Sequence, residues 1–144
     1  MSFFPLALQL EGKSILIVGG GRVATHKLKA ISQYCDGLTI LAPEVSDALR
    51  GKGYRIIEKR FEAQDIQGYF LVYACTNEKE TNAEVARVCR RANILVNVAD
   101  DPVFSDFISP AIYKEGSMSV AITSDGKDVR RSLDWREKIK QALR

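Results

Sequence analysis

The sequence predicts an α/β fold, a doubly wound parallel sheet, and three observations support this prediction. Short apolar runs alternate with helical segments over residues 14–100. The first of these runs leads directly into three consecutive glycines. A later run is apolar on both faces, as a strand buried between two helical layers is. Beyond residue 110 the alternation stops, and a predicted hairpin and a final helix follow.

Five segments are predicted strands because each is a short apolar run bounded by glycine, proline or polar residues. These are residues 14–18, 37–43, 54–60, 69–76 and 94–100. The first stops at a glycine, and the second is ended by Pro43. The third alternates more weakly, whereas the fourth is apolar on both faces and is therefore expected at the centre of the sheet.

Three segments are predicted helices because their apolar residues recur every three or four positions. These are residues 22–34, 79–92 and 129–143. Ala24 and Leu28 share a face of the first helix, and Val85 and Cys89 share a face of the second. The last helix carries an apolar face with Trp135 that no other predicted element covers.

The remaining segment, residues 111–127, is predicted to form a hairpin around Glu115 and Gly116. We therefore divide the chain into residues 1–110, a nucleotide-binding unit, and residues 111–144, the hairpin and final helix. The chain contains no internal repeat or low-complexity linker.

The composition is that of a soluble globular protein, with 46% hydrophobic and 27% charged residues. A net charge of +3 is too small to indicate a nucleic-acid partner. No apolar run approaches the ~18 residues that a membrane span requires, and the first ten residues lack the features of a signal peptide. The three cysteines are far apart and odd in number, which favours reduced thiols packed in the core of a cytoplasmic protein.

The glycines after the first strand fit a dinucleotide-binding loop. Gly19, Gly21 and Ala24 match G-x-G-x-x-G/A between a predicted strand and a predicted helix. Gly19 permits the tight turn, and Gly21 lets the backbone approach a pyrophosphate, which the N–H groups of the helix N-terminus then bind. These features predict a Rossmann-like fold. The alternative is a glycine turn that only packs the helix on the sheet.

The predicted cofactor-binding residues follow three of the strands. They are Gly19, Gly20, Gly21, Arg22, Val23, Pro43, Glu44, Thr76 and Asn77. Glu44 is the only acid near the end of the second strand, and no Arg or Lys there faces a 2′-phosphate. The pattern therefore favours NAD over NADP. Alternatively, Arg22, Val23, Pro43 and Glu44 are ordinary loop residues.

The candidate catalytic residue follows the fifth strand, where Asn97, Asp100, Asp101 and Asp106 lie close together in the sequence. A carboxylate at a strand end near apolar side chains can have a raised pKa and act as a general base. Asp100 is the candidate for that role. Asp101 and Asp106 are more typical of residues that start or cap turns.

Basic residues gather after the predicted hairpin, where Lys127, Arg130 and Arg131 would favour a polycarboxylate ligand if they face the site. Such charges are usually solvated. The only histidine, His26, has no second His or Cys at metal-ligand spacing, so no metal site is predicted.

Four stretches together resemble the siroheme-synthase dehydrogenase/chelatase family in the same order along nearly the whole chain. They are LQLEGKSILIVGGGRVATHK, YACTNEKETN, VNVADDPVFSDFISPAI and SVAITSDGK. The resemblance implies an NAD-dependent oxidation of precorrin-2 to sirohydrochlorin. In many members it also implies insertion of Fe²⁺, a substrate, to make sirohaem.

The resemblance also implies roles for particular residues. The family's key aspartate falls on Asp100, and its NAD contacts fall on Gly19–Val23 and on Pro43 and Glu44. The serine of its Ser-Gly-Gly loop falls on Ser124. The predicted substrate-binding residues are Asn97, Ser124, Lys127 and Arg130. Family members are usually homodimers, which would make residues 111–144 the dimerisation region and cover the apolar face of the final helix.

The chain departs from the family pattern at three places. Asp125 stands where the family usually has Gly, Asp128-Val129 where it has Ser-Pro, and His26 where Arg is common. An additional acid beside a polyanionic substrate is unexpected, so the departures favour dehydrogenase over chelatase activity. Two alternatives stay open: a chelatase with little dehydrogenase activity, and a module that senses NAD without turnover.

Overall fold

The computed structural model describes residues 1–99 and 101–144, and the chain divides into two compact units. The larger unit comprises Leu8–Asp106, and the smaller comprises Met1–Ala7 together with Phe107–Arg144. The first seven residues join the smaller unit, although they were predicted to belong to the nucleotide-binding part. One cause is a hydrogen bond in which the Phe3 N–H donates to Asp125 Oδ1 at 2.9 Å.

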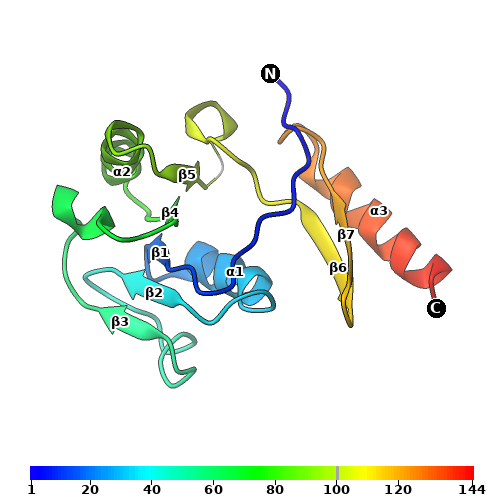
Figure 1. Cartoon of the computed structure of the whole chain (residues 1–144), viewed down its shortest axis with the longest axis horizontal. Coiled ribbons are helices and arrows are strands. Elements are labelled where there is room, and N and C mark those ends of the chain that lie inside the picture. The colour runs from blue at the N-terminus through cyan, green and yellow to red at the C-terminus, as the bar shows by residue number, and fades with distance from the viewer. Residues whose placement is uncertain (100) are drawn as a thin grey trace. The chain divides into compact units, whose positions relative to one another are not determined.

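The larger unit contains one parallel sheet of five strands, which confirms the predicted α/β class (Figure 1). The strands are β1 (Ile15–Val18), β2 (Leu38–Leu41), β3 (Arg55–Ile57), β4 (Leu71–Ala74) and β5 (Leu95–Val98). Their order across the sheet is β3-β2-β1-β4-β5. The chain reverses its direction of winding between β1 and β4, and ligands of open α/β sheets bind outside the carboxyl ends of the strands at such a point.

Two helices cover the sheet, α1 (Arg22–Ile31) and α2 (Lys79–Arg91). Both bury the faces predicted from their spacing, with Ala24 and Leu28 buried on α1 and Val85 and Cys89 buried on α2. Right-handed crossovers that wind in opposite directions from the sheet's centre place these helices on opposite faces. Figure 1 shows the strands between them.

The core of the larger unit uses the alternation of side chains along the central strands. Leu16 and Val18 of β1 pack in a cluster with Val85 and Cys89 of α2, and all four are buried. Ile15 and Ile17 are also fully buried, and alternation directs them to the opposite face of the sheet. Burial on both faces explains why the β1 sequence is continuously apolar.

Two short 3₁₀ helices were not predicted, η1 (Ala63–Ile66) and η2 (Pro102–Phe104). A capping box between Glu62 and Asp65 starts η1. Asp101 caps η2 by accepting from the Phe104 N–H at 3.4 Å, as expected for an Asp-Pro turn.

The smaller unit consists of the predicted hairpin and final helix. Strands β6 (Ala111–Glu115) and β7 (Met118–Ile122) pair antiparallel, and α3 (Val129–Ala142) packs against them (Figure 1). Gly116 in the turn has a φ of 58°, which suits glycine. The apolar face of α3 is only partly covered, because Trp135 is 48% exposed.

The glycine turn after β1 generates a prediction about folding. A Cβ on Gly19 would lie 2.4 Å from the Cys75 carbonyl oxygen, and Gly19 has a φ of +135°. A Cβ on Gly21 would have no atom within 4 Å. We expect Gly19→Ala to lower the free energy of unfolding by about 2–4 kcal/mol, and Gly21→Ala to change it by only about 0.5 kcal/mol. Urea unfolding followed by circular dichroism measures both, and equal stabilities would contradict this account of the turn.

Candidate functional site

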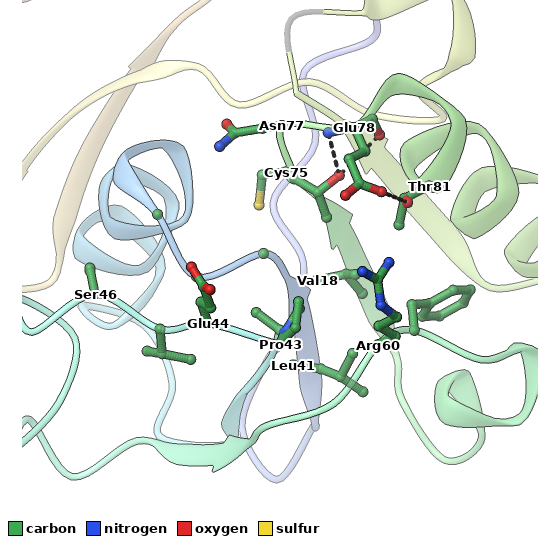
Figure 2. Close-up of a pocket in the computed structure, with 17 residues that line it drawn as sticks. Val18, Leu41, Pro43, Glu44, Ser46, Arg60, Cys75, Asn77, Glu78 and Thr81 are labelled. Carbon is green, nitrogen blue, oxygen red and sulfur yellow. Dashed lines mark hydrogen bonds between the residues drawn. The ribbon is translucent and has the colours of Figure 1, made fainter.

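A cleft of about 690 Å³ lies at the carboxyl ends of β1, β2 and β4 in the larger unit (Figure 2). This volume is in the range of small-molecule and cofactor sites. Most of the predicted cofactor residues line the cleft, namely Gly19, Gly20, Gly21, Pro43, Glu44, Thr76 and Asn77. Arg22 and Val23 are not among the described residues that line it; they form the first turn of α1.

The glycine loop lines this cleft, and its first two glycines pack closely against neighbouring backbone. A Cβ on Gly20 would lie 2.3 Å from the Glu44 carbonyl oxygen, and the Ser46 N–H donates to the Gly20 carbonyl at 2.8 Å. The Gly19 N–H donates to the Leu41 carbonyl at 2.9 Å. The loop is therefore fixed against β2 and the segment that follows it.

Gly21 leaves room at the point where α1 begins. No atom lies within 4 Å of the position of its missing Cβ, and the first N–H groups of a helix lack intrahelical acceptors. Ser46 Oγ, also beside the cleft, is buried with no hydrogen-bond partner among the described residues. The space beside Gly21, the N–H groups at the start of α1 and the unpartnered hydroxyl of Ser46 together suit the diphosphate of a dinucleotide.

The turn after β4 is held by a side chain that the sequence analysis did not single out, Asn82 of α2. Asn82 Oδ1 accepts from the Thr76 N–H at 3.0 Å and from Thr76 Oγ1 at 2.7 Å. Asn82 Nδ2 donates to the Thr76 carbonyl at 3.1 Å. This one amide satisfies both backbone groups of Thr76, and the turn keeps Thr76 and Asn77 beside the cleft.

Two charged residues of the cleft follow the strands β2 and β3. Glu44, after β2, and Arg60, after β3, both line it and both are exposed. Neither forms an ion pair with any residue that the structure describes. No local sequence pattern indicates Arg60, because it lies beyond β3 and only the strand order brings β3 next to β2 and the loop that follows β2.

Cys75, at the end of β4, also lines the cleft. Burial raises the pKa of its thiol to about 12, an effect that the positive charge of Lys27 only partly opposes. The thiol is therefore protonated at neutral pH and is a poor nucleophile. Burial likewise raises the pKa of Cys89 to about 12. Core packing, the role predicted for the cysteines, is confirmed for these two.

The segment after β5 contains residues with structural roles. Ser105 Oγ accepts from the Val98 N–H at 2.9 Å, and Asp106 Oδ2 accepts from the Val96 N–H at 3.0 Å. Asn97 is buried, with 4% of its surface exposed. Asp100, the predicted catalytic residue, lies outside the described residues. Among the residues described, none form a group of three or more ligands suited to a metal ion.

The predicted substrate residues Ser124, Lys127 and Arg130 lie in the smaller unit. Ser124 Oγ accepts from the Asp128 N–H at 2.9 Å and so helps to fix the start of α3. Lys127 and Arg130 are exposed and form no ion pair within the described part of the chain. They remain available to an anionic ligand.

The two acidic departures in this unit have local structural explanations. Asp125 has a φ of 56°, a left-handed conformation that Asp tolerates better than most residues and that also suits glycine. Asp128 is the N-cap of α3 and accepts from the Arg131 N–H at 2.9 Å. Serine and aspartate are both preferred N-caps, so Asp128 can replace a serine at this position without changing the cap.

The Asn82 contacts predict an effect on the cleft as well as on stability. Asn82→Ala removes three hydrogen bonds to Thr76, so we expect it to lower the free energy of unfolding by about 1–3 kcal/mol. We also expect it to raise the Kd for NAD severalfold, because the turn beside the cleft loses its support. Asn82→Asp keeps the acceptor and should have a smaller effect on both. Urea unfolding and calorimetry measure these values; wild-type stability in Asn82→Ala would contradict the role.

Three comparisons place the chain among known proteins. A family model described as putative NAD(P)-binding matches residues 6–111. The siroheme synthase of Tolumonas auensis is 39% identical over 129 residues, and that of a Psychrobacter strain is 37% identical over 131. Each match covers 88% of this chain but only 28% and 27% of the two synthases, so the chain spans less than a third of their length.

A solved structure titled SirC, precorrin-2 dehydrogenase, has a similar fold. It superposes with a TM-score of 0.81 at 26% sequence identity, covering 97% of this chain and 70% of that one. This likeness confirms the predicted fold, including the hairpin and final helix. In the described residues, no helix has both the length and the apolar character of a membrane span. The resemblance found in the sequence is confirmed, and the chain belongs to the putative NAD(P)-binding family.

Proposed function

We propose that this chain is an NAD-dependent precorrin-2 dehydrogenase that produces sirohydrochlorin. The observation that carries the proposal is the cleft over the glycine loop, in a chain whose fold matches a precorrin-2 dehydrogenase along 97% of its length. A module that senses NAD without turnover is not favoured, because the relatives are named as synthases and a dehydrogenase. Buried, unpaired cysteines also support a cytoplasmic location.

The residues of the cleft would bind and orient the cofactor. The glycine loop and the N-terminus of α1 hold the diphosphate, and Ser46 supplies a hydroxyl beside them. Glu44 accepts hydrogen bonds from a ribose, which favours NAD over its 2′-phosphorylated form. When bound, NAD supplies the hydride acceptor for the oxidation. The turn that Asn82 fixes keeps Thr76 and Asn77 at the cleft's β4 side.

Oxidation of a reduced tetrapyrrole removes protons as well as a hydride. We assign the proton acceptor to Asp100, the residue on which the family's key aspartate falls in the sequence resemblance, because a carboxylate can act as a general base. Lys127 and Arg130, with Ser124, would bind carboxylate side chains of the tetrapyrrole, and Asn97 completes the proposed substrate set. The same base could remove pyrrole protons during Fe²⁺ insertion, which would be a second activity.

Asp100→Ala tests the assignment of the base. We expect the rate of precorrin-2 oxidation to fall by about 10²- to 10⁴-fold, while the Kd for NAD changes less than about twofold. The measurement is anaerobic absorbance with precorrin-2 and NAD, followed by addition of Fe²⁺ to detect chelatase activity. Gly21→Asp is the matched control, because its carboxylate would repel the diphosphate and raise the Kd for NAD instead. Normal turnover by Asp100→Ala would remove Asp100 from the mechanism.

We further propose that the smaller unit forms a homodimer. Several of its apolar side chains are exposed, namely Met118, Val129, Leu133, Trp135 and Leu143. Exposed apolar patches of this kind mark interaction surfaces. The hairpin and α3, which carry these side chains, pack against each other in the same unit.

Sedimentation equilibrium tests the dimer. We expect the wild-type chain to sediment at twice the mass of one chain, and Trp135→Lys to dissociate at least tenfold more readily because a charge replaces buried apolar surface. Gln141→Lys adds the same charge at an exposed polar position of α3 and should leave the dimer intact. A wild-type chain that sediments as a monomer at micromolar concentration would contradict the proposal.

A further inference from the structure

Arg60 is directed into the cleft by the backbone that follows β3. The Lys59 N–H donates to the Ala42 carbonyl at 3.2 Å, so this segment continues alongside the end of β2. Lys59 Nζ turns to Glu62 at 2.7 Å and Asp65 at 2.9 Å, whereas Arg60 lines the cleft.

The guanidinium of Arg60 has no carboxylate partner among the residues that the structure describes. The nearest acids along the chain, Glu58 and Glu62, are already paired with Arg50 and Lys59, respectively. Arg60 forms no salt bridge or hydrogen bond with any residue that the structure describes. Figure 2 shows its side chain rising into the cleft between Pro43 and the start of α2, where Thr81 lies.

The chemistry of the cleft differs along its length. The glycine loop in the middle fits the diphosphate, and the β4 side presents the polar residues Thr76 and Asn77. The β2–β3 side instead presents Pro43 and Phe61 with the guanidinium of Arg60. Apolar surface beside a planar cation suits a flat aromatic ring, because guanidinium groups stack on such rings.

We propose that Arg60 binds the adenine base of the dinucleotide by stacking its guanidinium plane on the ring. This inference rests on the proposed binding of NAD and adds a residue to that site. A 2′-phosphate is the other group that an unpaired arginine could bind. Glu44 and Glu78 both line this cleft, and their carboxylates would repel a phosphate, so stacking on the base is favoured.

Calorimetric titration with NAD, NADP, ADP and nicotinamide mononucleotide tests the proposal on the full chain. We expect Arg60→Met to raise the Kd for NAD and ADP about tenfold, which corresponds to about 1.4 kcal/mol. The Kd for NADP should rise by the same factor, and that for the mononucleotide, which lacks adenine, should not change. Arg60→Lys keeps the charge without the plane, so NAD binding should remain weakened.

Arg55→Met is the matched control, since Arg55 is exposed at the opposite end of β3 and outside the cleft. It should bind all four ligands as the wild type does. Unchanged ADP binding by Arg60→Met would overturn the inference, as would a loss confined to NADP, which indicates a phosphate contact. A wild-type chain that fails to bind NAD would instead contradict the proposed function, so the two failures are distinguishable.

Discussion

The architecture of the larger unit depends on two glycines that have no room for a Cβ. At Gly19 the missing atom would meet the Cys75 carbonyl of the β4 end, and at Gly20 it would meet the Glu44 carbonyl after β2. The glycine turn can therefore lie against backbone on both sides. Because β1 is central in the sheet, this contact draws the segments after β2 and β4 to one place and forms the cleft between them.

The three glycines of that turn differ in how closely they are packed. A side chain at Gly19 or Gly20 would clash with backbone, whereas one at Gly21 would meet nothing within 4 Å, so packing does not require a glycine there. On the β4 side, the turn at Thr76 is held by Asn82, whose amide forms hydrogen bonds with the N–H and the carbonyl of Thr76. The fold and the proposed NAD site thus use the same turn but different residues of it. Substitutions at Gly19 are therefore expected to change stability, and substitutions at Gly21 to change the affinity for NAD.

The sequence predicted the strands and helices well because their signals are local. The continuous apolar run of β1 and the helical spacing of Val85 and Cys89 reflect burial that the structure confirms. The ends of elements were less accurate: α1 ends at Ile31, and η1 depends on a capping box that was not recognised. Most predicted cofactor residues follow strands and line the cleft. Arg60 was missed because its place depends on pairing between β2 and β3, which no local pattern encodes.

The departures from the family pattern also look different once the backbone is known. Two extra acids beside basic residues suggested a site less suited to a polyanion. Asp125 instead uses its carboxylate to hold the Phe3 N–H, and Asp128 uses its own to cap α3. A carboxylate at a helix N-terminus is partly compensated by the helix dipole. The acids therefore organise the loop around Ser124, and the exposed charges of Lys127 and Arg130 are not neutralised by ion pairs with them. A basic surface can persist beside acids when those acids are committed to backbone N–H groups.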